Sequence, residues 1–413
     1  MANTDTRSSK IEYGRLRRTR GYVNFFAAAT SARVADEMFS VAVVLHVLDR
    51  TGSAVIAGAT VACVTFPSLI TAPLLGGWLD LTGRRRFAMV CDQLLAASGL
   101  TLLLVLPGSM PDAAIPALGL VVGLTYPLSF GGFTSLIPQV VPEDLLAPAN
   151  ALEATSFNTA LIAGPAIAGT VVAVFGPAEA VVLEIALTLA ALVLILRIPG
   201  LDRAPRSDFD SLRQIVRAGL SHLAHTPPLL GATLIGAIGL GGIGLLTIAF
   251  PFFAVEHLDS GRGAAGYLWA AFAGGSAVGA VAFTGLQRRY APERIMVVAI
   301  GVLGLVMLTW PLAGTLPAAV ALIALGGLAD GPALAATFAV RQQHTPRHLH
   351  GQVMTTAVGF KIGAVALGAG TAGILVESLD SGSVVLIAAL MQFVAVAAGW
   401  LAMRSRSPVA VLR

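Results

Sequence analysis

The chain has 413 residues, of which 56% are hydrophobic and only 12% are charged. Soluble domains carry roughly 25% charged residues, so this composition excludes an ordinary water-soluble fold and places the chain in a lipid bilayer. A net charge of +4 at pH 7 would also suit a nucleic-acid binder, but the distribution of the basic residues indicates membrane topology instead.

Twelve apolar runs follow a basic N-terminal segment, residues 1–20. The first run is too long and too charged for a signal peptide, so we expect this segment to remain as a cytoplasmic tail. Each run is long enough for one helical crossing of the bilayer. The sequence therefore predicts helices near residues 21–48, 54–79, 87–110, 113–138, 151–175, 178–198, 229–256, 264–286, 294–313, 316–340, 352–376 and 383–403.

The basic residues support this count of crossings. With twelve spans, 22 of the 26 Lys and Arg residues fall on the side of the two termini, and only Arg50 and Arg262 fall in the gaps on the other side. Basic residues concentrate on the cytoplasmic side of membrane proteins. We therefore expect a multi-pass protein of the cell (cytoplasmic, inner) membrane with both termini in the cytoplasm.

The longest gap between spans, residues 199–228, divides the chain into six spans and six spans. Its apolar residues recur at helical spacing with Arg213 and Arg217 between them, which predicts an amphipathic helix on the inner membrane surface. The expected organisation is a cytoplasmic tail (1–20), a six-helix half (21–198), a cytoplasmic linker with an amphipathic helix (199–228), a second six-helix half (229–403) and a cytoplasmic tail (404–413).

Three charged residues lie about halfway along the first span. Arg33, Asp36 and Glu37 are spaced at i, i+3 and i+4, so they share one helix face. Charges inside a membrane are costly and usually face the bundle interior or an aqueous cavity. Arg33 either neutralises both carboxylates in a static cluster, or it tunes a proton-binding site. In the second case we favour Asp36 as the titrating group, with Glu37 as the alternative.

The segment Gly76–Arg86, which reads GGWLDLTGRRR, separates the second and third spans. Asp80 falls near the end of a hydrophobic helix, where the helix dipole disfavours a carboxylate, so it needs a cationic partner. One interpretation is a short loop whose arginines only set topology. The other is a conformational latch formed by Gly76, Asp80, Gly83, Arg84 and Arg85, with Glu153 as a second partner for Arg84.

Few other residues suggest chemistry. Asp330 and Lys361 fall in consecutive spans, where we expect them to pair, either as a static bridge or in contact with substrate. Cysteines and histidines show no metal-ligand spacing. No nucleotide-binding loop or hydrolytic triad stands out, so we expect neither an enzyme nor a cofactor nor a bound metal.

Two motifs resemble the major facilitator superfamily. Gly76, Asp80, Gly83, Arg84 and Arg85 fill the Gly-x-x-x-Asp-x-x-Gly-Arg pattern of the loop between its second and third helices. The predicted fifth span is similar to the antiporter motif of this family at Gly164, Pro165 and Gly169, but has Ala160 and Ala168 where the motif has glycine. The segments 36–53 and 127–169 look like the macrolide- and siderophore-exporter branch. The resemblance is specific in the first half of the chain and more diffuse in the second.

This resemblance implies an all-α fold of twelve transmembrane helices in two pseudo-symmetric halves around a central cavity. It also implies a monomeric secondary active transporter that exports a small apolar or amphipathic compound, such as a drug-like molecule or secondary metabolite, by proton antiport with alternating access. Related antiporters carry an arginine in the fourth span, and residues 113–138 contain none, so either the coupling differs or Arg33 takes that role. Aromatic residues on the cavity-lining spans either grip an apolar solute or only pack: Tyr126, Phe130 and Phe252.

Two other functions are open at this point. One is proton-independent facilitation or import of a small solute. The other is a membrane receptor or scaffold that transports nothing, but such a protein would lack a polar cavity. The intramembrane charges Asp36, Glu37, Asp330 and Lys361 argue against it.

Overall fold

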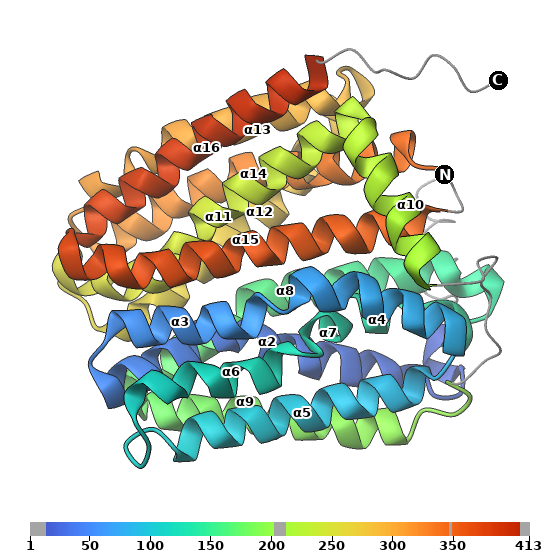
Figure 1. Cartoon of the computed structure of the whole chain (residues 1–413), viewed down its shortest axis with the longest axis horizontal. Coiled ribbons are helices and arrows are strands. Elements are labelled where there is room, and N and C mark those ends of the chain that lie inside the picture. Colours follow the sequence, from blue (N-terminus) through green and yellow to red (C-terminus); the bar gives the residue numbers. More distant parts are fainter. Residues whose placement is uncertain (1–13, 202–211, 347–348, 405–413) are drawn as a thin grey trace.

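A computed structural model describes residues 14–201, 212–346 and 349–404, and these residues form helices and loops without a strand. Figure 1 shows the helices side by side in one bundle, with the N-terminal half (blue to green) against the C-terminal half (yellow to red). The all-α, two-half architecture expected from the sequence is confirmed.

The N-terminal half contains eight helices because two of its crossings are interrupted. They are α2 (Tyr22–Thr51), α3 (Ala54–Thr65), α4 (Ser68–Thr82), α5 (Arg85–Val105), α6 (Ile115–Gly123), α7 (Tyr126–Val140), α8 (Leu146–Val174) and α9 (Pro177–Leu196). The C-terminal half contains α11 (Pro227–Glu256), α12 (Ala265–Ala282), α13 (Pro292–Met307), α14 (Leu316–His344), α15 (His350–Ser378) and α16 (Ser381–Arg404). Between the halves lies α10 (Leu212–His225).

Ten helical segments of the described chain are long and apolar enough to cross a membrane. Two further crossings bring the number to twelve. One is α2, whose charged residues lower its hydropathy. The other is the pair α6 and α7, which is interrupted at Leu124 and Thr125 just before Pro127. Interruptions of this kind are tolerated in membranes where neighbouring helices satisfy the freed backbone groups.

The two halves meet where α8 packs on α12 and where α15 packs on α3 and α4. Glycines allow the backbones to touch at these places. A side-chain Cβ at Gly266 of α12 would lie 2.8 Å from the Cα of Gly169 in α8, and a Cβ at Gly373 of α15 would lie 2.5 Å from the carbonyl oxygen of Ala54. Larger residues at these positions would therefore push the halves apart.

We expect Gly266→Val to separate the ends of α8 and α12. Its side chain would collide with the backbone of Pro165 and Gly169, whereas Gly274→Val on the same helix is a matched control because nothing lies within 4 Å of a Cβ built there. Distances between spin labels at Val174 and Asp259 report the separation. An unchanged distance distribution in the Gly266 variant would contradict this view of the interface.

Helix α10 crosses one end of the bundle (Figure 1), which we refer to as the α10 end. It contacts α4, α11 and α15, and Nε2 of His222 lies 2.9 Å from the carbonyl oxygen of His344. Arg213 and Arg217 are exposed while Leu223 is buried, so α10 presents a basic face outward and an apolar face to the bundle.

Candidate functional site

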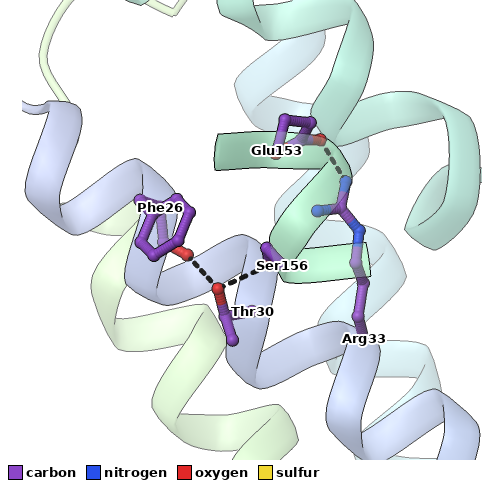
Figure 2. A network of polar contacts seen from close by, with 5 residues as sticks. All are labelled: Phe26, Thr30, Arg33, Glu153 and Ser156. Carbon is purple, nitrogen blue, oxygen red and sulfur yellow. Dashed lines mark hydrogen bonds and ion pairs between the residues drawn. The ribbon is translucent and has the colours of Figure 1, made fainter. Parts of the chain in front are cut away.

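A buried ion pair joins α2 to α8. Arg33 donates to the carboxylate of Glu153, and the two side chains are only 3% and 8% exposed. Figure 2 shows this pair beside a second contact between the same helices, in which the hydroxyls of Thr30 and Ser156 lie 2.7 Å apart. The guanidinium of Arg33 also lies 5.7 Å from the centre of the Phe157 ring, so aromatic surface covers the cation.

This geometry gives Arg33 a partner on another helix. Arg33 donates across to Glu153 on α8, a partner that the spacing along its own helix does not suggest. Glu153, which we expected to be a second partner for Arg84, lies in this buried pair, and the side chain of Arg84 is exposed. The reason is that Arg33 reaches between α2, α7 and α8, where its cation also faces the ring of Phe133, so the carboxylate on α8 becomes its counter-ion.

A cluster of acidic side chains lies next to this ion pair. Asp36, Glu37 and Glu184 all interact electrostatically with the hydroxyl of Tyr126, so residues of α2, α7 and α9 meet at one place. Among the described residues, the carboxylates of Glu37 and Glu184 have no ion-pair partner. We refer to these four residues as the acidic cluster.

Glu37 lies at the contact between α2 and α8. A Cβ at Gly164 would come 2.5 Å from the Cβ of Glu37 and 3.0 Å from the carbonyl oxygen of Val34. Gly164 therefore has no side chain because the backbone of α2 occupies that space. Any movement of α8 against α2 changes the surroundings of Glu37.

The antiporter-like motif of α8 has two contact faces. Gly164 faces α2, whereas Pro165 and Gly169 face Gly266 of α12 in the other half. The same two turns of α8 therefore contact the acidic cluster on one side and the interface between the halves on the other.

In the C-terminal half, Asp330 and Lys361 are close but do not form a direct ion pair within the described chain. Asp330 instead accepts a hydrogen bond of 2.8 Å from the hydroxyl of Ser276 on α12, and Lys361 lies within electrostatic range of it. The stem of Lys361 passes over Gly236 of α11, where a Cβ would lie 2.6 Å from its Cε. Both charged side chains are half-buried.

The three aromatic candidates, Tyr126, Phe130 and Phe252, do not share one location. Tyr126 belongs to the acidic cluster. Phe252 lies 5.6 Å from the guanidinium of Arg262, in the loop at the end of the bundle opposite α10. The side chain of Phe130 is outside the described residues. Of the two whose side chains are described, Tyr126 is brought together with other candidate site residues and Phe252 is not.

The segment Gly76–Arg86 is described only in part. Gly83 ends α4 with a φ of 66°, in the left-handed region that favours glycine, and its N–H donates to the carbonyl oxygen of Leu79 at 2.9 Å. Arg86 donates to the carbonyl oxygen of Ile198, a contact within the N-terminal half. Gly76 and the side chain of Asp80 are outside the part of the chain that the structure describes, so the latch remains a prediction.

Sequence reasoning missed Arg341. Its position after the apolar run 316–340 suggested a loop residue that only sets topology. In the structure α14 continues to His344, and Arg341 is 2% exposed. The available signal was the absence of a helix-breaking residue between Pro332 and Pro346.

Two pseudo-symmetric helical halves with intramembrane charges define a membrane transporter. The family model described as Major Facilitator Superfamily matches residues 25–361, and the chain belongs to this family.

Named relatives extend this assignment. The chain is 30% identical to the uncharacterized MFS-type transporter y4rN of Sinorhizobium fredii over 90% of this chain and 93% of that protein. It is 25% identical to the multidrug efflux pump Tap of Mycolicibacterium fortuitum over 84% and 86%. It is 20% identical to the macrolide efflux protein A of Streptococcus pyogenes over 58% and 60%. Among solved structures, that of the nucleoside transporter NupG superimposes with a TM-score of 0.70 at 13% identity, covering 93% of this chain and 99% of NupG.

Proposed function

We propose that this transporter exports a small apolar or amphipathic compound across the cell membrane and that entering protons drive the export. The observation that carries the proposal is the acidic cluster beside the antiporter-like motif of α8. The relatives named as multidrug and macrolide efflux proteins support export rather than import.

Proton coupling requires a group that binds a proton in one conformation and releases it in the other. Arg33 donates to Glu153 on α8, so a movement of α8 against α2 also changes the position of this cation relative to the carboxylates on its own helix. Of Asp36 and Glu37, we assign the titrating role to Glu37, since it packs against Gly164 and therefore senses the position of α8. A carboxylate that gains or loses charged neighbours exchanges its proton with solvent.

Alternating access would then link this exchange to the substrate. Members of the family expose a midplane site to one side at a time as the halves rock against each other. The contact between Gly169 and Gly266 would hold the halves together at the end opposite α10, and the predicted latch at Asp80 would hold them together at the α10 end.

Transport into inverted membrane vesicles tests this function. A panel of lipophilic cations, neutral macrolides and siderophores should contain at least one compound that accumulates when the vesicle interior is acidified and stops accumulating when an uncoupler is added. Equilibration without accumulation would indicate a facilitator. Transport of no compound in either direction would favour a receptor or scaffold.

We also expect α10 and both termini to be cytoplasmic, because basic residues concentrate at the α10 end. In a background in which Cys63 and Cys91 are replaced by serine, His225→Cys should resist an impermeant thiol reagent in intact cells, and Asp259→Cys should react. Both positions are exposed in the structure, so access to the reagent depends on the side of the membrane. Labelling of His225→Cys but not of Asp259→Cys would show that the topology is the reverse of the one proposed.

A further inference from the structure

Within the described residues, Arg341 is a buried cation without a counter-ion. Its side chain belongs to α14, is 2% exposed, and its Nε and Nη2 atoms have no hydrogen-bond partner in the part of the chain that the structure describes. Burial of a guanidinium is costly unless charged or polar acceptors compensate it. Arginines that serve only packing are normally paired, as Arg33 is with Glu153, so the state of Arg341 requires an acceptor from elsewhere.

The surrounding charges make an anion the suitable acceptor. Lys361 of α15 lies within electrostatic range of Arg341 and adds a second positive charge. Asp330, the acid within electrostatic range of Lys361, already accepts the hydrogen bond from Ser276. Glu293 at the start of α13 lies 3.7 Å from His344 instead. Among the described residues, Arg341 and Lys361 supply two positive charges and Asp330 supplies one negative charge, which leaves one positive charge in excess.

Arg341, Lys361 and Asp330 lie at increasing depth from the α10 end of the bundle. With a rise of 1.5 Å per residue, Arg341 lies about 5 Å from the α10 end of α14, Lys361 about 16 Å from the same end of α15, and Asp330 about 21 Å from it. The exposed fraction increases inward, from the buried Arg341 to the half-buried Lys361 and Asp330. The cations thus lead from the proposed cytoplasmic side to the middle of the membrane.

We propose that Arg341 and Lys361 form a binding site for an acidic group of the transported compound, a carboxylate, sulfonate or phosphate. A guanidinium offers a fork of N–H donors that matches such groups in a bidentate manner, and the ammonium of Lys361 adds a point charge deeper in the membrane. This inference rests on the proposed transport function and narrows its substrates to amphipathic compounds that carry an anionic group.

Equilibrium binding tests the site without depending on transport. The probes are 1-naphthoate and its neutral isostere 1-naphthamide, measured by equilibrium dialysis against the full-length protein in nanodiscs, with empty nanodiscs subtracted. The wild type should bind naphthoate at least tenfold more tightly than naphthamide. Arg341→Gln should abolish this preference and leave naphthamide binding unchanged, while Arg341→Lys should retain part of it.

Two further variants separate the site from general effects of charge. Lys361→Gln should reduce the preference for naphthoate, and Arg294→Gln, which removes an exposed cation from the same end of the bundle, should not. If Arg341→Gln does not fold, the reduced preference for naphthoate expected in Lys361→Gln and in Arg341→Lys tests the site instead. Three results would overturn the proposal. They are equal affinity of the wild type for the two probes, no binding of naphthoate, or an undiminished preference for naphthoate in both Arg341→Gln and Lys361→Gln.

Failure of the transport proposal would look different. If naphthoate binding depends on Arg341 but no compound accumulates against a gradient in vesicles, the anion site stands and proton-driven export does not. If a neutral or cationic compound accumulates on a proton gradient while naphthoate binding is indifferent to Arg341, export stands and the anion site is wrong.

Discussion

Glu153→Ala is expected to destabilise the protein by about 3–5 kcal/mol, the usual cost of removing one partner of a buried ion pair. The substitution leaves the guanidinium of Arg33 buried between α2 and α8, beside the rings of Phe133 and Phe157, without its hydrogen-bonded carboxylate on α8. Unfolding of the purified protein in detergent, followed by circular dichroism or a thiol-reactive dye, measures the loss.

Two controls make this test specific. Glu143→Ala removes an exposed carboxylate just before α8 and should change the stability by no more than about 0.5 kcal/mol. The double variant Arg33→Leu, Glu153→Leu should recover much of the lost stability, because replacing both charges by apolar groups leaves no unpaired charge. A Glu153 variant as stable as the wild type would show that the pair contributes nothing to the contact of α2 with α8.

The combined substitution Asp36→Asn, Glu37→Gln should abolish accumulation of substrate against its gradient while leaving substrate binding intact. Both changes keep the shape of the side chains and remove the groups that exchange a proton. Glu37→Gln alone should reproduce most of the loss, since Glu37 is the residue packed on Gly164. Uptake into inverted vesicles under an imposed pH gradient measures the accumulation.

Glu179→Gln provides the matched control because Glu179 is an exposed acid at the start of α9. It should accumulate substrate like the wild type. If the Asp36→Asn, Glu37→Gln variant still accumulates substrate, the proton site lies elsewhere, and Asp330 becomes the next candidate.

The sequence predicts the elements of this fold well because a bilayer imposes simple rules. A crossing needs about 20 apolar residues, and the basic residues mark the cytoplasmic gaps. Even the interrupted pair α6 and α7 is predicted as one crossing of residues 113–138, since hydropathy does not depend on the local break at Leu124 and Thr125.

The partners of the charged residues are not predictable in the same way. Spacing along one helix suggests that Arg33 pairs with Asp36 and Glu37, but 120 positions separate Arg33 from its observed partner Glu153. Nothing local in the sequence encodes that contact. Likewise Ser276 binds Asp330 from another helix, and a serine in an apolar run gives no sign of its role.

Proton-coupled export is tested most directly by measuring whether each movement of substrate is accompanied by proton movement in the opposite direction. Inverted vesicles that hold a pH-sensitive dye and an acidic lumen are given a compound that the transport panel has shown to accumulate. Proton antiport predicts that the compound enters while the lumen becomes more alkaline, and that the Asp36→Asn, Glu37→Gln variant shows neither change. Entry of the compound without proton movement, or the same proton movement in the variant, would contradict it.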